Sequence, residues 1–127
     1  MNKEQNLTRA YCVKECRKWL TVLNELRIEN VQLKEQLSEA ISHEVSLALV
    51  EKAEQFQQQF VEKDQIIDLL RHDINTMLEK LHERTITRTE ENQYAIMQED
   101  MTKLIREFHQ IAVTFYQFLG NSDLNYT

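Results

Sequence analysis

The chain has 127 residues, enough for one domain or for one domain with a helical extension. It contains no proline and one glycine, and 28% of its residues are charged, so long helices are favoured over strands. The net charge is −6, although the first eighteen residues hold five basic and two acidic side chains and so carry +3. The rest of the chain is therefore acidic, which excludes the sustained positive face that nucleic-acid binding requires. These properties predict an all-α protein that does not bind nucleic acid.

The first predicted helix runs from about residue 7 to residue 41. Apolar side chains recur in it at alternating spacings of four and three, the heptad pattern of a coiled coil. We expect this stripe to be the seam of a parallel homodimer. The seam consists of Cys16, Trp19, Leu23, Leu26, Asn30, Leu33 and Leu37, flanked by Cys12 and Ala40. Asn30 at an a position can pair with its copy and fix a two-stranded state, or it can point to solvent at the edge of an intramolecular bundle.

Between Leu37 and Phe56 consecutive apolar residues are four positions apart and no longer alternate between four and three. Such a spacing locally unwinds a coiled coil or marks a bend. Because neither glycine nor proline stands here, we favour one continuous or gently bent helix over residues 5–84. The alternative is a break near Ser42, which is an acceptable N-cap residue.

The second and third apolar stripes mirror each other. The second consists of Phe56, Phe60, Ile67, Leu70, Ile74, Leu78 and Leu81. The third consists of Tyr94, Met97, Met101, Leu104, Phe108, Ile111, Phe115 and Phe118. Apart from Ile111, which falls opposite Lys63, their members pair so that the two residue numbers add to 174 or 175. Two antiparallel helices need this arrangement if their apolar faces are to meet, so the stripes predict a helical hairpin.

The predicted turn of the hairpin covers residues 83–90. Thr87 and Glu90 have the spacing of a capping box, so the third helix should begin near them and run to Leu119. Gly120 and Asn121 can stop it, which leaves a flexible tail over residues 121–127. The predicted domains are thus an N-terminal coiled-coil helix (1–50), the hairpin (51–120) and this tail.

Three residues widen the third stripe beyond a two-helix seam: Ile105, Ala112 and Leu119. The extra width requires more helices, because apolar side chains left in water forfeit about 1.5–3 kcal/mol each. A dimer of hairpins forming a four-helix bundle supplies them. A monomeric three-helix bundle, in which the first helix folds back, is the alternative.

One candidate for chemistry is the segment 72–78, which reads HDINTML. It resembles the phosphoacceptor box of the dimerisation-and-phosphotransfer domain of sensor histidine kinases. The resemblance implies that His72 accepts phosphate, that Asp73 acts as acid or base, and that Thr76 helps to position water. Met77 stands where that family commonly has proline, and a chain with one glycine cannot supply nucleotide-binding loops, so the phosphate would come from a separate kinase. The alternative is an ordinary exposed histidine on a helix.

Metal, cofactor and nucleophile patterns are weak. Glu79 and His82 form a single Glu-x-x-His pair where di-iron bundles need two, so we expect neither metal nor cofactor. Cys12 and Cys16 lie on a packing seam and are too far apart for an unstrained disulfide with each other. We therefore expect reduced thiols, as in other cytoplasmic proteins. No segment approaches the roughly 20 apolar residues of a membrane span, and the polar N-terminus does not resemble a signal peptide.

The sequence therefore predicts a non-enzymatic, cytoplasmic coiled-coil protein. It would form a homodimer and act as a scaffold or adaptor for a further protein, without a membrane or nucleic-acid partner. The alternatives are a histidine phosphotransfer helper that uses His72 and a subunit of a heteromeric coiled-coil assembly.

Overall fold

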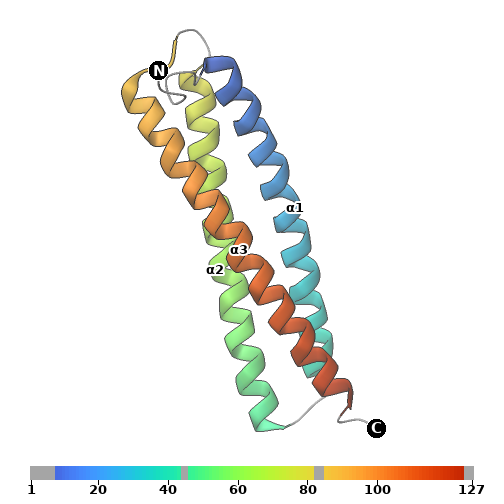
Figure 1. The fold of residues 1–127 in the computed structure, drawn as a ribbon. Helices are drawn as coiled ribbons and strands as arrows, with labels where there is room; N and C mark the ends of the chain where they lie inside the picture. Colours follow the sequence, from blue (N-terminus) through green and yellow to red (C-terminus); the bar gives the residue numbers. More distant parts are fainter. Residues whose placement is uncertain (1–7, 44–45, 82–84, 125–127) are drawn as a thin grey trace.

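The computed structural model describes residues 8–43, 46–81 and 85–124, with side chains described as far as residue 120. Three long helices lie side by side in one elongated bundle (Figure 1). They are α1 (Arg9–Ser42), α2 (Leu47–Lys80) and α3 (Arg88–Leu124). No strand occurs in the described ranges, so the all-α prediction is confirmed.

The continuous helix over residues 5–84 is wrong, and the break near Ser42 is the arrangement found. Ser42 is the last residue of α1, and its hydroxyl donates to the carbonyl oxygen of Glu39 at 2.7 Å. Ser46, in extended conformation, is the N-cap of α2 and accepts from the backbone N–H of Leu49. The chain reverses between them, because folding back lets the apolar stripe of α1 meet α2 and α3. Within this chain the three helices therefore form a three-helix bundle, with α1 folded back on α2 and α3.

The second connection follows the predicted capping box. The Thr87 hydroxyl accepts from the backbone N–H of Glu90 at 3.2 Å, and the Glu90 carboxylate accepts from the backbone N–H of Thr87 at 3.0 Å. This reciprocal pair confirms the predicted start of α3. The predicted stop is wrong, since α3 continues through Gly120 to Leu124. Glycine weakens a helix without ending it, and here it has no positive φ. Residues 82–84 of the predicted turn and 125–127 of the predicted tail lie outside the described residues.

The core has two ends. Near the start of α1, Trp19 stacks on Tyr94 with ring centroids 5.0 Å apart, next to Cys12 and Cys16. Toward the opposite end the core is rich in phenylalanine. Phe60 meets Phe115 edge to face at 5.2 Å, and the rings of Phe56 and Phe118 are also 5.2 Å apart. These contacts join the residues that the mirrored stripes paired, so the antiparallel hairpin is confirmed.

The structure places the predicted hairpin stripes in the interior, with Leu78, Ile111 and Phe118 half-buried at its edge. Of the three residues that widen the third stripe, Ala112 is buried, Leu119 is half-buried and Ile105 stays exposed. Lys63, which the stripes set opposite Ile111, is buried along its stem, and its ammonium pairs with the carboxylate of Glu107 at 2.7 Å.

The seam that the sequence assigned to a second copy is covered inside the chain. Leu26 is half-buried, and the other seam residues, from Cys16 to Leu37, are buried against α2 and α3. At the end of the bundle, the Arg9 guanidinium donates to the carbonyl oxygen of Leu81 at 3.1 Å, which fastens the start of α1 to the end of α2. The helices α1 and α2 are thus held together over their full length.

Candidate protein-binding groove

The outer side of the helical hairpin is hollowed between α2 and α3. Two adjoining hollows, of about 270 and 330 Å³, share the side chains of Asp73 and Asp100. We call the two together the α2/α3 groove. Its walls consist of Ile66, Leu69, Asp73, Thr76 and Lys80 on α2 and of Gln93, Ile96, Asp100, Lys103 and Glu107 on α3. Buried core side chains form its floor: Leu70, Met77, Met97 and Leu104.

The walls of the groove follow the heptad rule. From Ile66 to Lys80 the spacings are three, four, three and four, and from Gln93 to Glu107 they are the same. Each wall therefore keeps to one side of its helix, next to the core stripe. Since α2 and α3 are antiparallel, the residue numbers of facing wall positions add to 172 or 173. This second, outer stripe has a regular spacing in the sequence, but it lies outside the apolar core stripes and includes polar residues.

The groove exposes large apolar side chains. Leu69 is 64% exposed and Ile96 is 57% exposed, although each stands beside buried core residues. Ile66 is half-buried on the same wall as Leu69. Scattered apolar side chains are normal on a protein surface, but Ile66 and Leu69 line one of the two adjoining hollows and Ile96 lines the other. The groove is therefore a partly apolar surface between α2 and α3.

Two carboxylates, one on each wall, line the middle of the groove. Asp73 stands on α2 and Asp100 on α3, and both line both hollows. Among the described residues neither carboxylate has an ion-pair or hydrogen-bond partner. Lys80 and Lys103 belong to the walls but lie beyond the 4.0 Å distance of an ion pair. At the end near Glu107 the charge is already matched, because Lys63 donates to it and lowers the pKa of that carboxyl.

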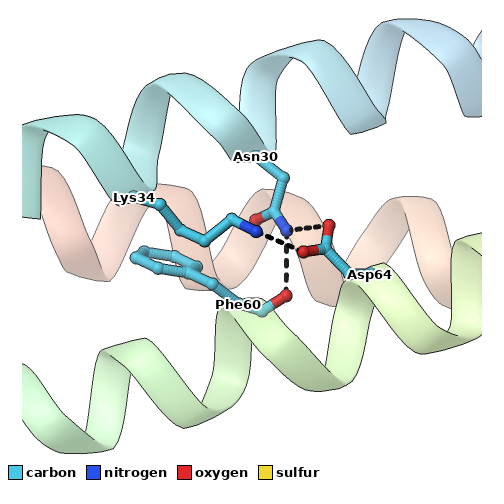
Figure 2. Close-up of polar contacts among 4 residues, drawn as sticks. All are labelled: Asn30, Lys34, Phe60 and Asp64. Carbon is cyan, nitrogen blue, oxygen red and sulfur yellow. Dashed lines mark hydrogen bonds and ion pairs between the residues drawn. The ribbon is translucent and has the colours of Figure 1, made fainter.

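On another side of α2, a buried polar cluster fixes how α1 and α2 align (Figure 2). The amide nitrogen of Asn30 donates to the carbonyl oxygen of Phe60 at 2.8 Å and to the carboxylate of Asp64 at 2.6 Å. The ammonium of Lys34 pairs with the other oxygen of Asp64. Asn30 is therefore not at a solvent-facing edge: it is fully buried, and its hydrogen-bond partners in this structure belong to the same chain.

The three residues of the segment that resembles a phosphoacceptor box have different surroundings in the structure. His72 and Asp73 are exposed, but Asp73 lines the groove. The hydroxyl of Thr76 donates to the carbonyl oxygen of His72 at 2.9 Å, one helical turn back. The exposure of His72 suits a phosphoacceptor, whereas the Thr76 hydroxyl is engaged with the backbone and not with the imidazole.

The cysteines are placed for packing. Cys12 and Cys16 are free thiols with no exposed surface, and burial raises the pKa of each to about 11. Thiols with so raised a pKa form little nucleophilic thiolate near neutral pH. Burial also raises the pKa of Tyr94, whose hydroxyl has no hydrogen-bond partner in the described part of the chain.

Within the described ranges, no group of three or more His, Cys, Asp and Glu side chains is placed to hold a metal ion. His82, half of the Glu-x-x-His pair, lies outside them. None of the helices, so far as they are described, is both long and apolar enough to cross a membrane.

The fold and the groove define the protein as an α-helical bundle of three long helices with an open outer face on its second and third helices. Comparison of the chain with protein-family models, with curated proteins and with solved structures gave no match.

Proposed function

We propose that this protein is a non-enzymatic binding module of the cytoplasm, which uses the α2/α3 groove to hold another protein. The observation that supports this most is the exposure of Leu69 and Ile96 on the heptad-spaced walls of two adjoining hollows. A partner that covered them would gain part of the roughly 1.5–3 kcal/mol that a fully buried large side chain contributes. A helical bundle that lacks one helix supplies such a surface ready-made.

The test is affinity capture from an extract of the cells in which the protein occurs. The double variant Leu69→Asp/Ile96→Asp places charges in the groove without touching the buried core, so it should fold and lose the captured partner. The matched control is Ile28→Asp on α1, since Ile28 is 52% exposed and does not line the groove. A partner that the groove variant still captured as well as the parent would contradict the proposal.

Self-association is the second partner class, and the heptad stripe of α1 supports it. Because that stripe is buried within the chain, a homodimer through the same residues requires α1 to pack on α2 and α3 of a second copy. The same bundle contacts would then form between chains. Light scattering decides between one chain of 15.2 kDa and two.

Phosphotransfer through His72 is the alternative from another class, and the exposure of His72 is the observation in its favour. Incubation with a labelled phosphodonor, with His72→Gln as the control, tests it directly. Label that appears in the parent and not in the variant would support it, and the absence of label in both would exclude it.

A further inference from the structure

We infer that the α2/α3 groove receives an amphipathic helix of a partner protein, with one lysine or arginine placed between two apolar residues seven positions apart. This inference depends on the proposed function and specifies the chemistry of the partner. It follows from three properties of the groove: the spacing of its walls, the position of its apolar side chains and the charge at its middle.

The spacing of the walls requires a helix. Both walls repeat every three and four residues, so each presents one row of side chains along its whole length. Each wall spans fourteen residue steps, from 66 to 80 and from 93 to 107, or about 21 Å at a rise of about 1.5 Å per residue. A groove of this length between two helices is long enough for a further helix to pack there, as in a four-helix bundle.

The apolar side chains lie on either side of the acidic middle. Leu69 precedes Asp73 by four residues on α2, and Ile96 precedes Asp100 by four residues on α3. Because the two helices are antiparallel, Leu69 and Ile96 lie in opposite directions from the carboxylates, each by about 6 Å along the bundle. A docked helix reaches both with apolar residues about 10–12 Å apart, a spacing of seven residues.

The charge at the middle favours a cation from the partner, since neither carboxylate is paired with Lys80 or Lys103 on the walls. Asp73 and Asp100 would be covered by the docked helix, and a covered carboxylate without a partner is costly. A lysine or arginine between the two apolar residues of the ligand pairs with both carboxylates. An arginine suits this position best, because its planar guanidinium offers several donors at once.

The same charge disfavours a second copy as the occupant. If two grooves faced each other about a two-fold axis, the carboxylates of Asp73 and Asp100 would oppose their own copies. The net charge of −6 adds repulsion between whole chains. A basic helix removes both penalties, so the partner is a different protein.

A pair of synthetic peptides tests the inference. The first is a labelled 20-residue alanine- and glutamine-rich helix with two leucines seven positions apart and an arginine four positions after the first leucine. The second has glutamine in place of the arginine. Titration of the full chain, followed by fluorescence anisotropy, should show at least tenfold weaker binding of the second peptide.

Protein variants complete the cycle. The double variant Asp73→Asn/Asp100→Asn should bind the arginine peptide at least tenfold more weakly than the parent and should no longer distinguish the two peptides. The matched control is Glu51→Gln/Glu54→Gln, which removes the same charge from exposed positions of α2 outside the groove. It should bind both peptides as the parent does. Circular dichroism checks that each variant keeps its helices.

The outcomes separate the inference from the proposed function. If Leu69→Asp/Ile96→Asp loses the captured partner but Asp73→Asn/Asp100→Asn binds partner and peptide as the parent does, the groove binds proteins and the basic helix is wrong. If the groove variants keep every captured partner, the proposed function is wrong as well. Self-association that Leu69→Asp abolishes would make a second copy the occupant and overturn the inference.

Discussion

Asn30 shows how one buried amide can align two helices. Its nitrogen bonds two acceptors on α2, while its oxygen is buried without a hydrogen-bond partner among the described residues. The two hydrogen bonds of the amide nitrogen favour one alignment of α1 with α2, whereas the buried amide oxygen without a partner costs about 1–3 kcal/mol of stability. Such a residue contributes to the choice of structure more than to its stability.

We therefore expect Asn30→Leu to change the free energy of unfolding by no more than about 1 kcal/mol, because the lost hydrogen bonds and the relieved oxygen nearly offset each other. In contrast, Asn30→Asp should destabilise the bundle by about 3 kcal/mol near neutral pH, since its carboxylate would lie against the carboxylate of Asp64 and the carbonyl of Phe60. Urea denaturation measures both. An Asn30→Leu variant that lost several kcal/mol would show that the amide is mainly a stabilising group.

The ion pair between Lys63 and Glu107 makes a further prediction about pH. The hydrogen bond from Lys63 lowers the pKa of Glu107 below its ordinary value of 4.5, so the folded state holds this proton less tightly than the unfolded state does. The pair therefore stabilises the fold fully above about pH 4.5 and loses its contribution as the pH falls through the lowered pKa.

We expect Glu107→Gln to be less stable than the parent by about 1 kcal/mol at pH 7, because Glu107 remains partly exposed to solvent. The difference should shrink as the pH falls below 4.5. Urea denaturation at a series of pH values follows it, with Glu54→Gln as a control at an exposed position. A difference that grew toward low pH would contradict this assignment of the pair.

At the level of helices, the sequence predicted the features that depend on patterns within one segment. It did not favour the break that depends on which helices pack against each other. The mirrored stripes and the capping box of Thr87 and Glu90 are local, and both are found. The break after Ser42 is not local. No glycine or proline marks it, and the chain turns there because α1 gains a core by folding back. Only the tertiary contacts decide between a bent helix and a turn.

The capping box offers a test of how much a helix end contributes. Thr87→Ala removes the hydroxyl that accepts from Glu90 and should lower the free energy of unfolding by about 1 kcal/mol. Thr114→Ala is the matched control, because its hydroxyl bonds only the backbone of its own helix on an exposed face. Thermal unfolding followed by circular dichroism compares the two. An equal effect of both substitutions would mean that the cap is not a stabilising feature.

For the molecule as a whole, the candidate site was harder to predict than the fold. The groove needs the hairpin and the position of α1 together: α1 covers one side of α2 and α3 and leaves the other side open. Asp73 was singled out from the sequence for its place after His72, whereas in the structure it lines the same two hollows as Asp100. No sequence motif includes the other residues of the groove that matter here: Asp100, Leu69 and Ile96. Their shared heptad spacing was the available signal, and it gains meaning only once α2 and α3 are known to be neighbours.

We expect the connection between α1 and α2 to determine how many chains make one bundle. The axes of packed helices lie about 8–10 Å apart, so a chain without connecting residues cannot turn from one helix into the next. Deletion of residues 43–46 joins Ser42 directly to Leu47 and should force α1 and α2 into one long helix. The apolar stripe of α1 can then be covered only by α2 and α3 of a second copy.

We expect the deletion variant to be a dimer by light scattering, with helix content equal to that of the parent, because every bundle contact re-forms between chains. A matched variant with Gly-Gly-Ser inserted after His43 lengthens the connection and should have the mass of one chain, 15.2 kDa apart from the insertion. If the parent is already an exchanged dimer, it will match the deletion variant in mass and convert to single chains on insertion. A deletion variant that stayed folded with the mass of one chain would contradict the role of the connection, since α1 would then have to leave its stripe in water.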